Sequence, residues 1–365
     1  MSMGSFCLLF WVLTTALSAG QVQARWPAPV EGNYVVRDFK FETGEILPEL
    51  RLHYTTVGTP VKDAAGNVQN AVLIMHGTTG SGRGFLSNQF AGGLFGPGQL
   101  LDATKYYIIL PDAVGHGRSS KPSDGMRMRF PKYTYNDMVV AQHRMLVEHL
   151  GVRHLSLVMG TSMGGMMTWV WGTTYPDFMD ALMPLASLPV EIAGRSRMIR
   201  KMIVDSIQND PDWKGGEYQS PPVRGLTGAI HMMLFMVSSP LQWQKQAPTR
   251  AAAEAYLQNR INGYLRSLEA NDMIYQYEAS RDYNPALHLE KITAPLYAVN
   301  SADDQVNPPE LGILDREIKR VKRGRYILIP ISDQTTGHGT HSNPAIWGKY
   351  LAELLAESKA ILPGR

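Results

Sequence analysis

A serine flanked by small residues is the side chain of this sequence best suited to nucleophilic chemistry. The segment GTSMGG, residues 160–165, follows the apolar run LSLVM and precedes a segment with a helical pattern. A turn from strand to helix this sharp crowds the backbone, so the positions two before and two after the serine need residues without bulk. Such a turn places the hydroxyl at a helix N-terminus, where backbone N–H groups stabilise developing negative charge. We therefore expect Ser162 to be a nucleophile.

A serine hydroxyl needs a base to become a strong nucleophile, and the base needs a carboxylate to orient it. The segment SADDQVNP, residues 301–308, follows the run PLYAVN, and TGHGTH, residues 336–341, follows RYILIP. Asp304 is favoured over Asp303 as the acid, because the acid of such a loop usually lies four residues before a proline. His338 is favoured over His341 as the base, because flanking glycines let its backbone turn toward the sheet edge. Asp303 and His341 remain the alternatives.

A tetrahedral intermediate also needs N–H donors for its oxyanion. One expected donor is the backbone N–H of Met163, which follows the nucleophile, and the other should come from the loop HGTTG after the run AVLIM. Within that loop Thr78 is the expected donor and Thr79 the alternative. His76 and His116 lie beside other apolar runs, outside the order of serine, acid and histidine. We expect both of them to be structural.

The elements that must position these residues alternate along the chain. Continuous apolar runs fit strands buried on both faces, hence a mostly parallel sheet covered by helices. Two earlier segments alternate polar and apolar residues, as half-exposed antiparallel strands do. Helical patterns cover residues 135–150 and 345–360. The predicted strands are residues 34–41, 50–57, 71–75, 106–110, 155–159, 181–185, 295–300 and 325–330.

The regular alternation stops between residues 191 and 289, where methionines and tryptophans accompany helical patterns. We predict a helical cap inserted into an α/β core made of residues 25–190 and 290–365. The methionines of the cap are either an adaptable apolar wall of a binding site or the cap's own core. The sequence leaves both interpretations open.

The composition of the chain excludes several classes of function. The chain has 365 residues, of which 44% are hydrophobic and 18% charged, so it can bury a large core. A net charge of +3 without a basic tract gives no indication of nucleic-acid binding. Cys7 is the only cysteine, and no phosphate-binding or dinucleotide fingerprint occurs. The sequence therefore predicts no cofactor and no metal.

The N-terminus resembles an export signal. Residues 6–19 form an uncharged apolar run that is too short to span a membrane, and Val22-Gln23-Ala24 has the small residues that signal peptidase prefers. We expect a signal peptide over residues 1–24, cleavage after Ala24 and a periplasmic or secreted protein without a membrane span. A retained N-terminal anchor is the alternative.

The motifs together resemble the homoserine O-acetyltransferase family of the α/β-hydrolase superfamily. This resemblance implies an eight-stranded α/β-hydrolase sheet with a helical cap, a serine nucleophile and an acyl-enzyme intermediate. The matching segments are FP at 130–131, Thr134, DMV at 137–139, AQ at 141–142, LG at 150–151, SMGGM at 162–166, NDPDW at 209–213, GGEY at 215–218 and GL at 225–226.

Two departures from the family's pattern bear on the substrate. Ile230 occupies the position where family members usually carry an arginine that holds the amino-acid substrate, and Gly339 replaces an aspartate after the histidine. An apolar pocket without a cation binds a carboxylate poorly. Together with export, this favours hydrolysis of a small-molecule acyl ester. Acyl-CoA-dependent O-acyl transfer is the alternative, a catalytically inactive binding protein is a third, and a homodimer is possible.

Overall fold

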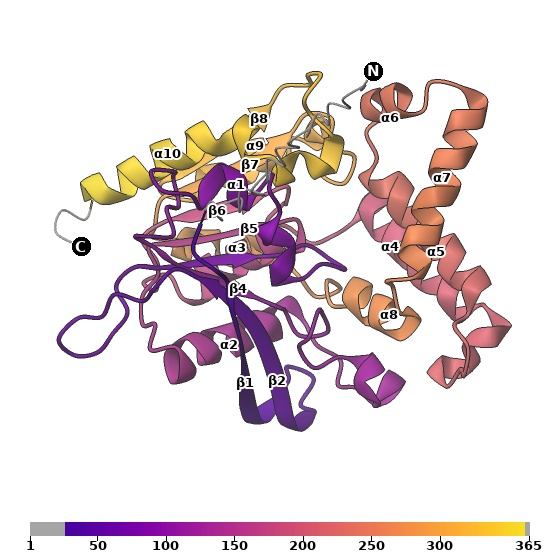
Figure 1. Cartoon of the computed structure of the whole chain (residues 1–365), viewed down its shortest axis with the longest axis horizontal. Helices are drawn as coiled ribbons and strands as arrows, with labels where there is room; N and C mark the ends of the chain where they lie inside the picture. Colours follow the sequence, from indigo (N-terminus) through magenta and orange to yellow (C-terminus); the bar gives the residue numbers. More distant parts are fainter. Residues whose placement is uncertain (1–25, 362–365) are drawn as a thin grey trace, which may run out of the picture.

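The computed structural model describes residues 26–361. Eight strands within them form one sheet, in the order β1-β2-β4-β3-β5-β6-β7-β8 (Figure 1). The pairs β1–β2 and β2–β4 are antiparallel, and all other neighbours are parallel. The strands are β1 (Val30–Lys40), β2 (Ile46–Val57), β3 (Ala71–Met75), β4 (Tyr107–Pro111), β5 (Leu157–Thr161), β6 (Leu182–Leu185), β7 (Leu296–Ser301) and β8 (Gly324–Ile329).

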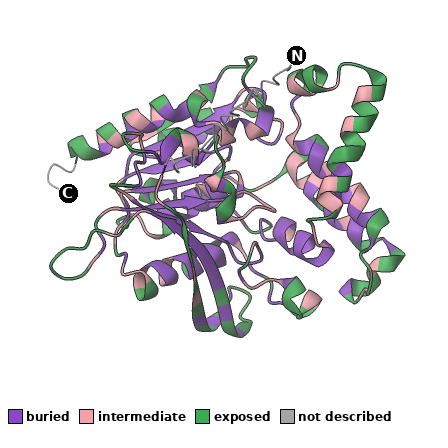
Figure 2. Ribbon diagram, in the orientation of Figure 1, coloured by how far each residue is buried: buried purple, intermediate pink, exposed green. Residues whose placement is uncertain are grey.

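The central strands are buried on both faces, which explains their continuous apolar sequences. In β3, Leu73 and Met75 face one apolar core, while Val72 and Ile74 face the other. Helices cover both faces, so the sheet lies in the interior (Figure 2). On the face of Leu73 lie α2 (Tyr135–Arg144), α3 (Met163–Thr174) and α9 (Ile313–Glu317), and on the other face lie α1 (Ala91–Leu94) and α10 (Pro344–Ile361).

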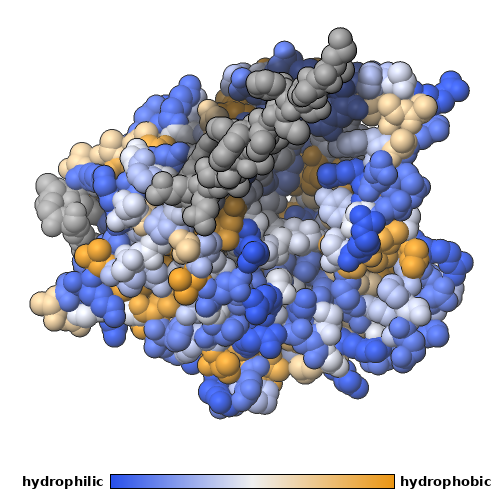
Figure 3. All heavy atoms as spheres, viewed as in Figure 1, coloured by the Kyte–Doolittle hydropathy of each residue, from blue (hydrophilic) through white to orange (hydrophobic). Residues whose placement is uncertain are grey.

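A group of helices between β6 and β7 forms a cap at one side of the sheet (Figure 1). It has its own apolar core, in which side chains of α4, α5, α7 and α8 meet. The face seen in Figure 3 is mostly polar, with an apolar patch over the cap. The helices are α4 (Gly194–Gln208), α5 (Val223–Val237), α6 (Pro240–Gln246), α7 (Arg250–Leu265) and α8 (Ala270–Glu278), all inside the predicted interval 191–289.

The predicted fold class is confirmed, with small shifts at the ends of the elements. The strand expected from residue 155 begins at Leu157, because Leu155 makes only an isolated bridge to Met179. The helix expected over residues 135–150 is α-helical only to Arg144 and continues as one π-helical turn. The expected leader, residues 1–24, lies outside the described residues. Among the helices within residues 26–361, none has the length and apolarity to cross a membrane.

Candidate active site

The turn between β5 and α3 holds Ser162 in a strained conformation. Ser162 has φ 56° and ψ −113°, a backbone conformation that residues other than glycine rarely adopt. The neighbouring glycines permit the turn: a Cβ on Gly160 would lie 2.3 Å from the backbone of Gly164, and a Cβ on Gly164 would lie 1.9 Å from the carbonyl oxygen of Met75. The sequence pattern of this turn therefore has a steric cause, and the strain presents the hydroxyl at the carboxyl edge of the sheet.

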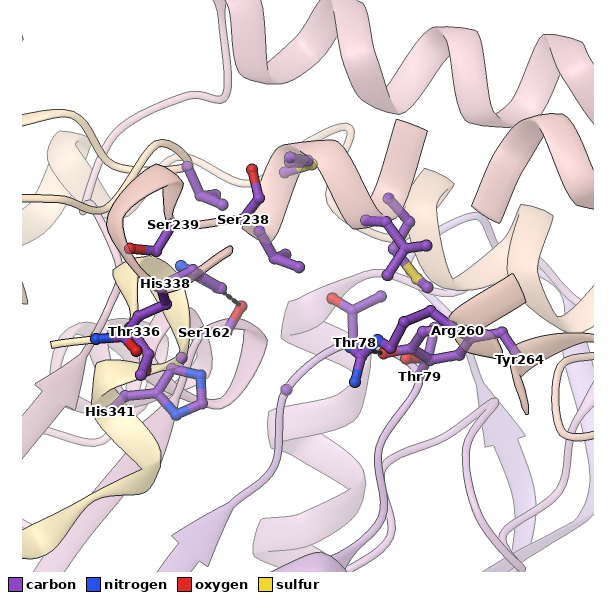
Figure 4. Close-up of a pocket in the computed structure, with 18 of the residues that line it drawn as sticks. Thr78, Thr79, Ser162, Ser238, Ser239, Arg260, Tyr264, Thr336, His338 and His341 are labelled. Carbon is purple, nitrogen blue, oxygen red and sulfur yellow. Dashed lines mark hydrogen bonds between the residues drawn. The ribbon is translucent and has the colours of Figure 1, made fainter. Parts of the chain in front are cut away.

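Ser162, His338 and Asp304 form one chain of hydrogen bonds (Figure 4 shows its first link). His338 Nδ1 lies 2.9 Å from Asp304 Oδ2, and because a carboxylate only accepts, the Nδ1–H donates. His338 Nε2 is then the acceptor for the Ser162 hydroxyl, 2.8 Å away. The three residues follow β5, β7 and β8, whose carboxyl ends lie at the same edge of the sheet.

Asp304 is fully buried and held as an anion by its neighbours. Burial by itself raises the pKa of this carboxyl, but the charge and hydrogen bond of His338, with hydrogen bonds from Asn307 and Val306, outweigh burial and lower the pKa. The N–H of Val306 donates to Asp304 Oδ1 over 2.8 Å, and Asn307 Nδ2 donates to Oδ2 over 2.9 Å. The carboxylate can therefore orient the imidazole and stabilise a positive charge on it.

Asp303 hydrogen-bonds the loops around the imidazole. Its Oδ1 accepts from the Ser301 hydroxyl at 2.5 Å, and its Oδ2 accepts from the N–H of Gly337 at 2.9 Å. The Ser239 hydroxyl of the cap donates to the same Oδ2 over 3.3 Å. Of the two candidate acids, Asp304 is the one in contact with His338, and Asp303 ties the histidine loop to the cap.

His341, the alternative base, and His116 both lie in structural surroundings. The ring of His341 lies 5.4 Å from that of His338, and its Nδ1 shares a hydrogen bond of 3.1 Å with the Ser342 hydroxyl. Burial, reinforced by His338, lowers the pKa of His341 to about 3. His116 donates from Nδ1 to the carbonyl of Val114, and burial lowers its pKa to about 3 as well. Both rings therefore stay neutral near pH 7, and neither contacts the serine.

His76 fixes the loop that carries the predicted oxyanion donor. The N–H of Ala113 donates to His76 Nε2 over 3.1 Å, so the ring proton is on Nδ1, which donates to the carbonyl of Gly77 at 2.8 Å. The N–H of Gly80 donates to the same carbonyl over 3.0 Å. Because the peptide bond is planar and trans, anchoring this carbonyl also fixes the direction of the Thr78 N–H.

The second predicted donor begins a helix. Met163 is the first residue of α3, where the backbone N–H has no carbonyl one turn earlier in the helix to bind. In Figure 4, the Ser162 hydroxyl lies between His338 on one side and Thr78 on the other. Thr78 and Thr79 both line the cavity above Ser162. An acyl carbon bound to the serine would thus lie between a base and a loop of backbone donors.

Comparisons with known proteins agree with this geometry. Residues 70–330 match the family described as alpha/beta hydrolase fold. The chain belongs to this α/β-hydrolase family. A homoserine O-acetyltransferase of Geotalea daltonii is 36% identical over 337 residues, covering 82% of this chain and 90% of the relative. This similarity confirms the expected relationship to the homoserine O-acetyltransferases.

Solved structures show the same α/β-hydrolase fold. Esterase E22 matches with a TM-score of 0.78 at 18% identity, covering 90% of this chain and all of that chain. The homoserine O-acetyltransferase of Bacillus anthracis matches with a TM-score of 0.77 at 20% identity, covering 90% of this chain and 97% of that chain. The protein is an enzyme of the α/β-hydrolase superfamily, and these two neighbours differ in activity. The choice between hydrolysis and transfer thus depends on the site.

Two cavities of this protein meet at Ser162. Cavity 1, of about 430 Å³, lies under the cap and is lined by His338 and Thr78. Cavity 2, of about 420 Å³, extends between α4 and the loop after β7. Ser162 and Arg200 line both cavities. Within residues 26–361, no group of three or more His, Cys, Asp or Glu side chains is placed to hold a metal.

Arg200 is a buried cation without an acidic partner among the described residues. Its side chain is 4% exposed, its Nη1 donates to the Ser280 hydroxyl over 3.3 Å, and its guanidinium lies 5.6 Å from the centre of the Tyr277 ring. Its Nε is buried without a hydrogen-bond partner. The expectation that the pocket lacks a cation is therefore wrong: Ile230 is buried in the core of the cap, and Arg200 supplies the charge.

Sequence reasoning missed Arg200, although α4 carries a signal for it. The buried residues of α4 are Arg200, Ile203, Val204 and Ile207, which recur with helical spacing along one face. A basic residue on an otherwise apolar helix face is unusual, because burying a charge is costly. That pattern marks Arg200 in the sequence, but only the packed cap shows that it faces Ser162's cavities.

Proposed function

We propose that the protein is a serine acyltransferase that carries the acyl group on Ser162 and passes it to a hydroxyl-bearing acceptor. The hydrogen-bonded chain from Ser162 through His338 to Asp304 is the observation that carries this proposal. Asp304 holds the imidazole in the tautomer whose Nε2 can accept the serine proton. A nucleophile, a base and an orienting carboxylate are the parts that acyl transfer requires.

In the first half of the reaction, Ser162 Oγ bonds to the carbonyl carbon of the acyl donor while its proton passes to His338 Nε2. The N–H groups of Met163 and Thr78 stabilise the oxyanion. When the oxyanion collapses, the bond from the acyl carbon to the leaving group breaks, and His338 returns the proton to that group. In the second half, the acceptor hydroxyl gives its proton to His338 and attacks the acyl carbon, and Ser162 leaves with the proton.

Arg200 supports a hydroxyl acceptor that also carries a carboxylate. A buried guanidinium without an anion is costly, and a bound carboxylate would offset that cost. The sequence relative from Geotalea daltonii is a homoserine O-acetyltransferase, and homoserine has a hydroxyl and a carboxylate, which favours transfer over hydrolysis. One argument for hydrolysis, the absence of a cation, no longer holds at this site. The other, export, concerns residues outside those described.

Hydrolysis of an acyl ester is the second candidate, with the same residues in the same roles. It is favoured by Ile230, which is buried in the cap core at the position where the related enzymes usually place their substrate-binding arginine. If no acceptor is held tightly, water can enter the site, give its proton to His338 and resolve the acyl-enzyme. The two candidates differ only in what attacks the acyl carbon.

Product analysis distinguishes the candidates. The purified protein is given acetyl-CoA or p-nitrophenyl acetate, with and without homoserine and other hydroxy acids, and the products are measured by mass spectrometry. If the enzyme transfers the acetyl group, formation of the O-acetyl product should saturate with acceptor concentration, and release of acetate should fall as acceptor is added. If acetate is released at the same rate with and without every hydroxyl acceptor, the transfer proposal is overturned and hydrolysis remains.

A further inference from the structure

We propose that cavity 2 binds the acyl chain and that this chain is longer than acetyl, an inference that rests on the proposed acyl-enzyme at Ser162. Cavity 2 opens from the nucleophile, because Ser162 lines it together with the buried side chains of Met166, Ala186 and Val306. Its volume of about 420 Å³ is large, since one water molecule occupies about 30 Å³ in the liquid. An acetyl group, with two carbons, would leave most of it empty.

The positions of the catalytic groups assign the two cavities. In the tetrahedral intermediate, the acyl carbon carries Ser162 Oγ, the oxyanion, the leaving group and the acyl chain. The leaving group must be within reach of His338 Nε2, and the oxyanion within reach of the Thr78 N–H. Both His338 and Thr78 line cavity 1 and are not among the residues that line cavity 2. The acyl chain is the substituent left for cavity 2.

The lining of cavity 2 suits an apolar chain. Apart from Arg200, at the junction of the cavities, its charged side chains, Glu191, Arg195 and Glu310, are exposed and form the rim. The apolar side chains are half-buried or buried, except for exposed Leu311 and Ala193. They come from the loop after β6, from α3, from the loop after β7 and from the first residue of α9. They are Met166, Ala186, Leu188, Val190, Ile192, Ala193, Val306, Pro308, Leu311 and Ile313.

Cavity 1 has a different lining, which suits the leaving group and the acceptor. Its cap side combines polar and aromatic side chains of α6 and α7, among them Gln242, Tyr256, Arg260 and Tyr264, with the apolar side chains of Met233, Leu234, Met236 and Val237 of α5. Figure 4 shows Arg260 and Tyr264 across the cavity from His338. A polar alcohol or thiol can find hydrogen-bond partners there, whereas an alkyl chain would leave those groups unpaired. Cavity 1 thus offers polar partners beside an apolar wall, which agrees with the assignment drawn from the catalytic groups.

The test measures acylation of the wild-type protein by two ester series. One series keeps p-nitrophenol as the leaving group and lengthens the acyl chain from acetyl to decanoyl. The other keeps acetyl and varies the alcohol. Each methylene buried in cavity 2 should raise the acylation rate constant about fourfold, as about 0.8 kcal/mol per buried CH₂ requires. We expect butyryl and hexanoyl esters to acylate at least about tenfold faster than acetyl. A rate that is highest for acetyl and falls with each added carbon would overturn the proposal.

A pair of matched variants tests which cavity holds which group. Val190→Trp fills cavity 2, and Val237→Trp places the same bulk in cavity 1. We expect Val190→Trp to abolish the preference for longer acyl chains and to leave the order of alcohols unchanged. Val237→Trp should change the order of alcohols and keep the acyl-chain profile. The reversed pattern would overturn the assignment.

Two controls separate this proposal from the proposed function. Val190→Ala widens cavity 2 with little risk to folding and should move the optimum toward longer chains, whereas an unmoved optimum would count against the assignment. If Ser162 is not the nucleophile, wild type will form no acyl adduct at that residue with any ester. If only the cavity assignment is wrong, the adduct will form, but Val190 variants will not alter its dependence on chain length.

Discussion

Replacing Arg200 with methionine should make the free protein more stable and make the enzyme worse. Methionine keeps much of the length of the side chain and removes the charge. Arg200 is 4% exposed, and its guanidinium has no acidic partner among the described residues; its neighbours include the Ser280 hydroxyl and the Tyr277 ring. Replacing a buried ion pair with apolar side chains of similar volume often stabilises other proteins, by about 1–4 kcal/mol. We expect Arg200→Met to raise the free energy of unfolding by an amount in that range, measured by urea denaturation.

The same change should remove recognition of a carboxylate. Loss of one partner of a buried, hydrogen-bonded charge pair costs about 2–5 kcal/mol, which is a loss of about 30-fold to several thousandfold in kcat/KM. The assay compares a hydroxy acid with its methyl ester as acceptor. Arg200→Met should lose activity toward the acid and change activity toward the methyl ester by less than about threefold. Arg200→Lys should retain part of the discrimination.

Arg197 provides the matched control. It lies on the same helix, one turn earlier, where its side chain is 30% exposed and pairs with Glu278 at 3.3 Å, outside both cavities. Arg197→Met should leave the ratio of acid to methyl ester unchanged and should not stabilise the protein. Equal losses on the acid and on the methyl ester in Arg200→Met would refute the reasoning, as would a large loss of stability.

Three further predictions concern the loops beside the nucleophile. Asp304→Asn should lower kcat by about 10⁴-fold. Because folding lowers the pKa of Asp304, the ionised carboxylate should stabilise the protein fully above about pH 4, and this contribution should be lost as the pH falls below that value. The free energies of unfolding of wild type and variant, measured by urea denaturation, should therefore converge in acid. Asp303→Ala removes the acceptor of the Gly337 N–H, and we expect kcat to fall about tenfold with an unchanged pH profile, against the much larger loss in Asp304→Asn. His341→Gln should change kcat by less than about tenfold. If kinetic assays show that this variant has lost activity completely, His341 becomes a candidate base.

The sequence predicts the fold well, because burial on both faces leaves a direct mark on it. The run Ala71–Met75 is apolar at every position, and the structure places all of it in β3 between two cores. The apolar run predicts a strand from Leu155, two residues before β5 begins, because apolarity marks burial while pairing with a neighbouring strand decides where the strand begins. Residue patterns identify buried segments more directly than they identify their ends.

The candidate site was partly accessible from the sequence for a similar reason. Glycines around Ser162 are required by contacts within a few residues, so they are visible locally. The loop after β7 holds two adjacent aspartates, and the contact of Asp304 with His338 joins positions 34 residues apart. The hydrogen bond from the Gly337 N–H to Asp303 has the same sequence separation, and no sequence pattern indicates it. Arg200 reaches the site only through packing of the cap: the apolar face of α4 marks it as buried, but no sequence pattern shows which cavity it lines.

The most direct test of the account is the site of covalent acylation. The wild-type protein is mixed with p-nitrophenyl butyrate, quenched in acid within the first turnover, and examined by intact-mass and peptide mass spectrometry, with Ser162→Ala treated in parallel. The account predicts one butyryl group on the peptide that contains Ser162, released with the same time course as the final product, and no adduct in the variant. An adduct on another residue, or wild-type turnover that Ser162→Ala retains, would contradict it.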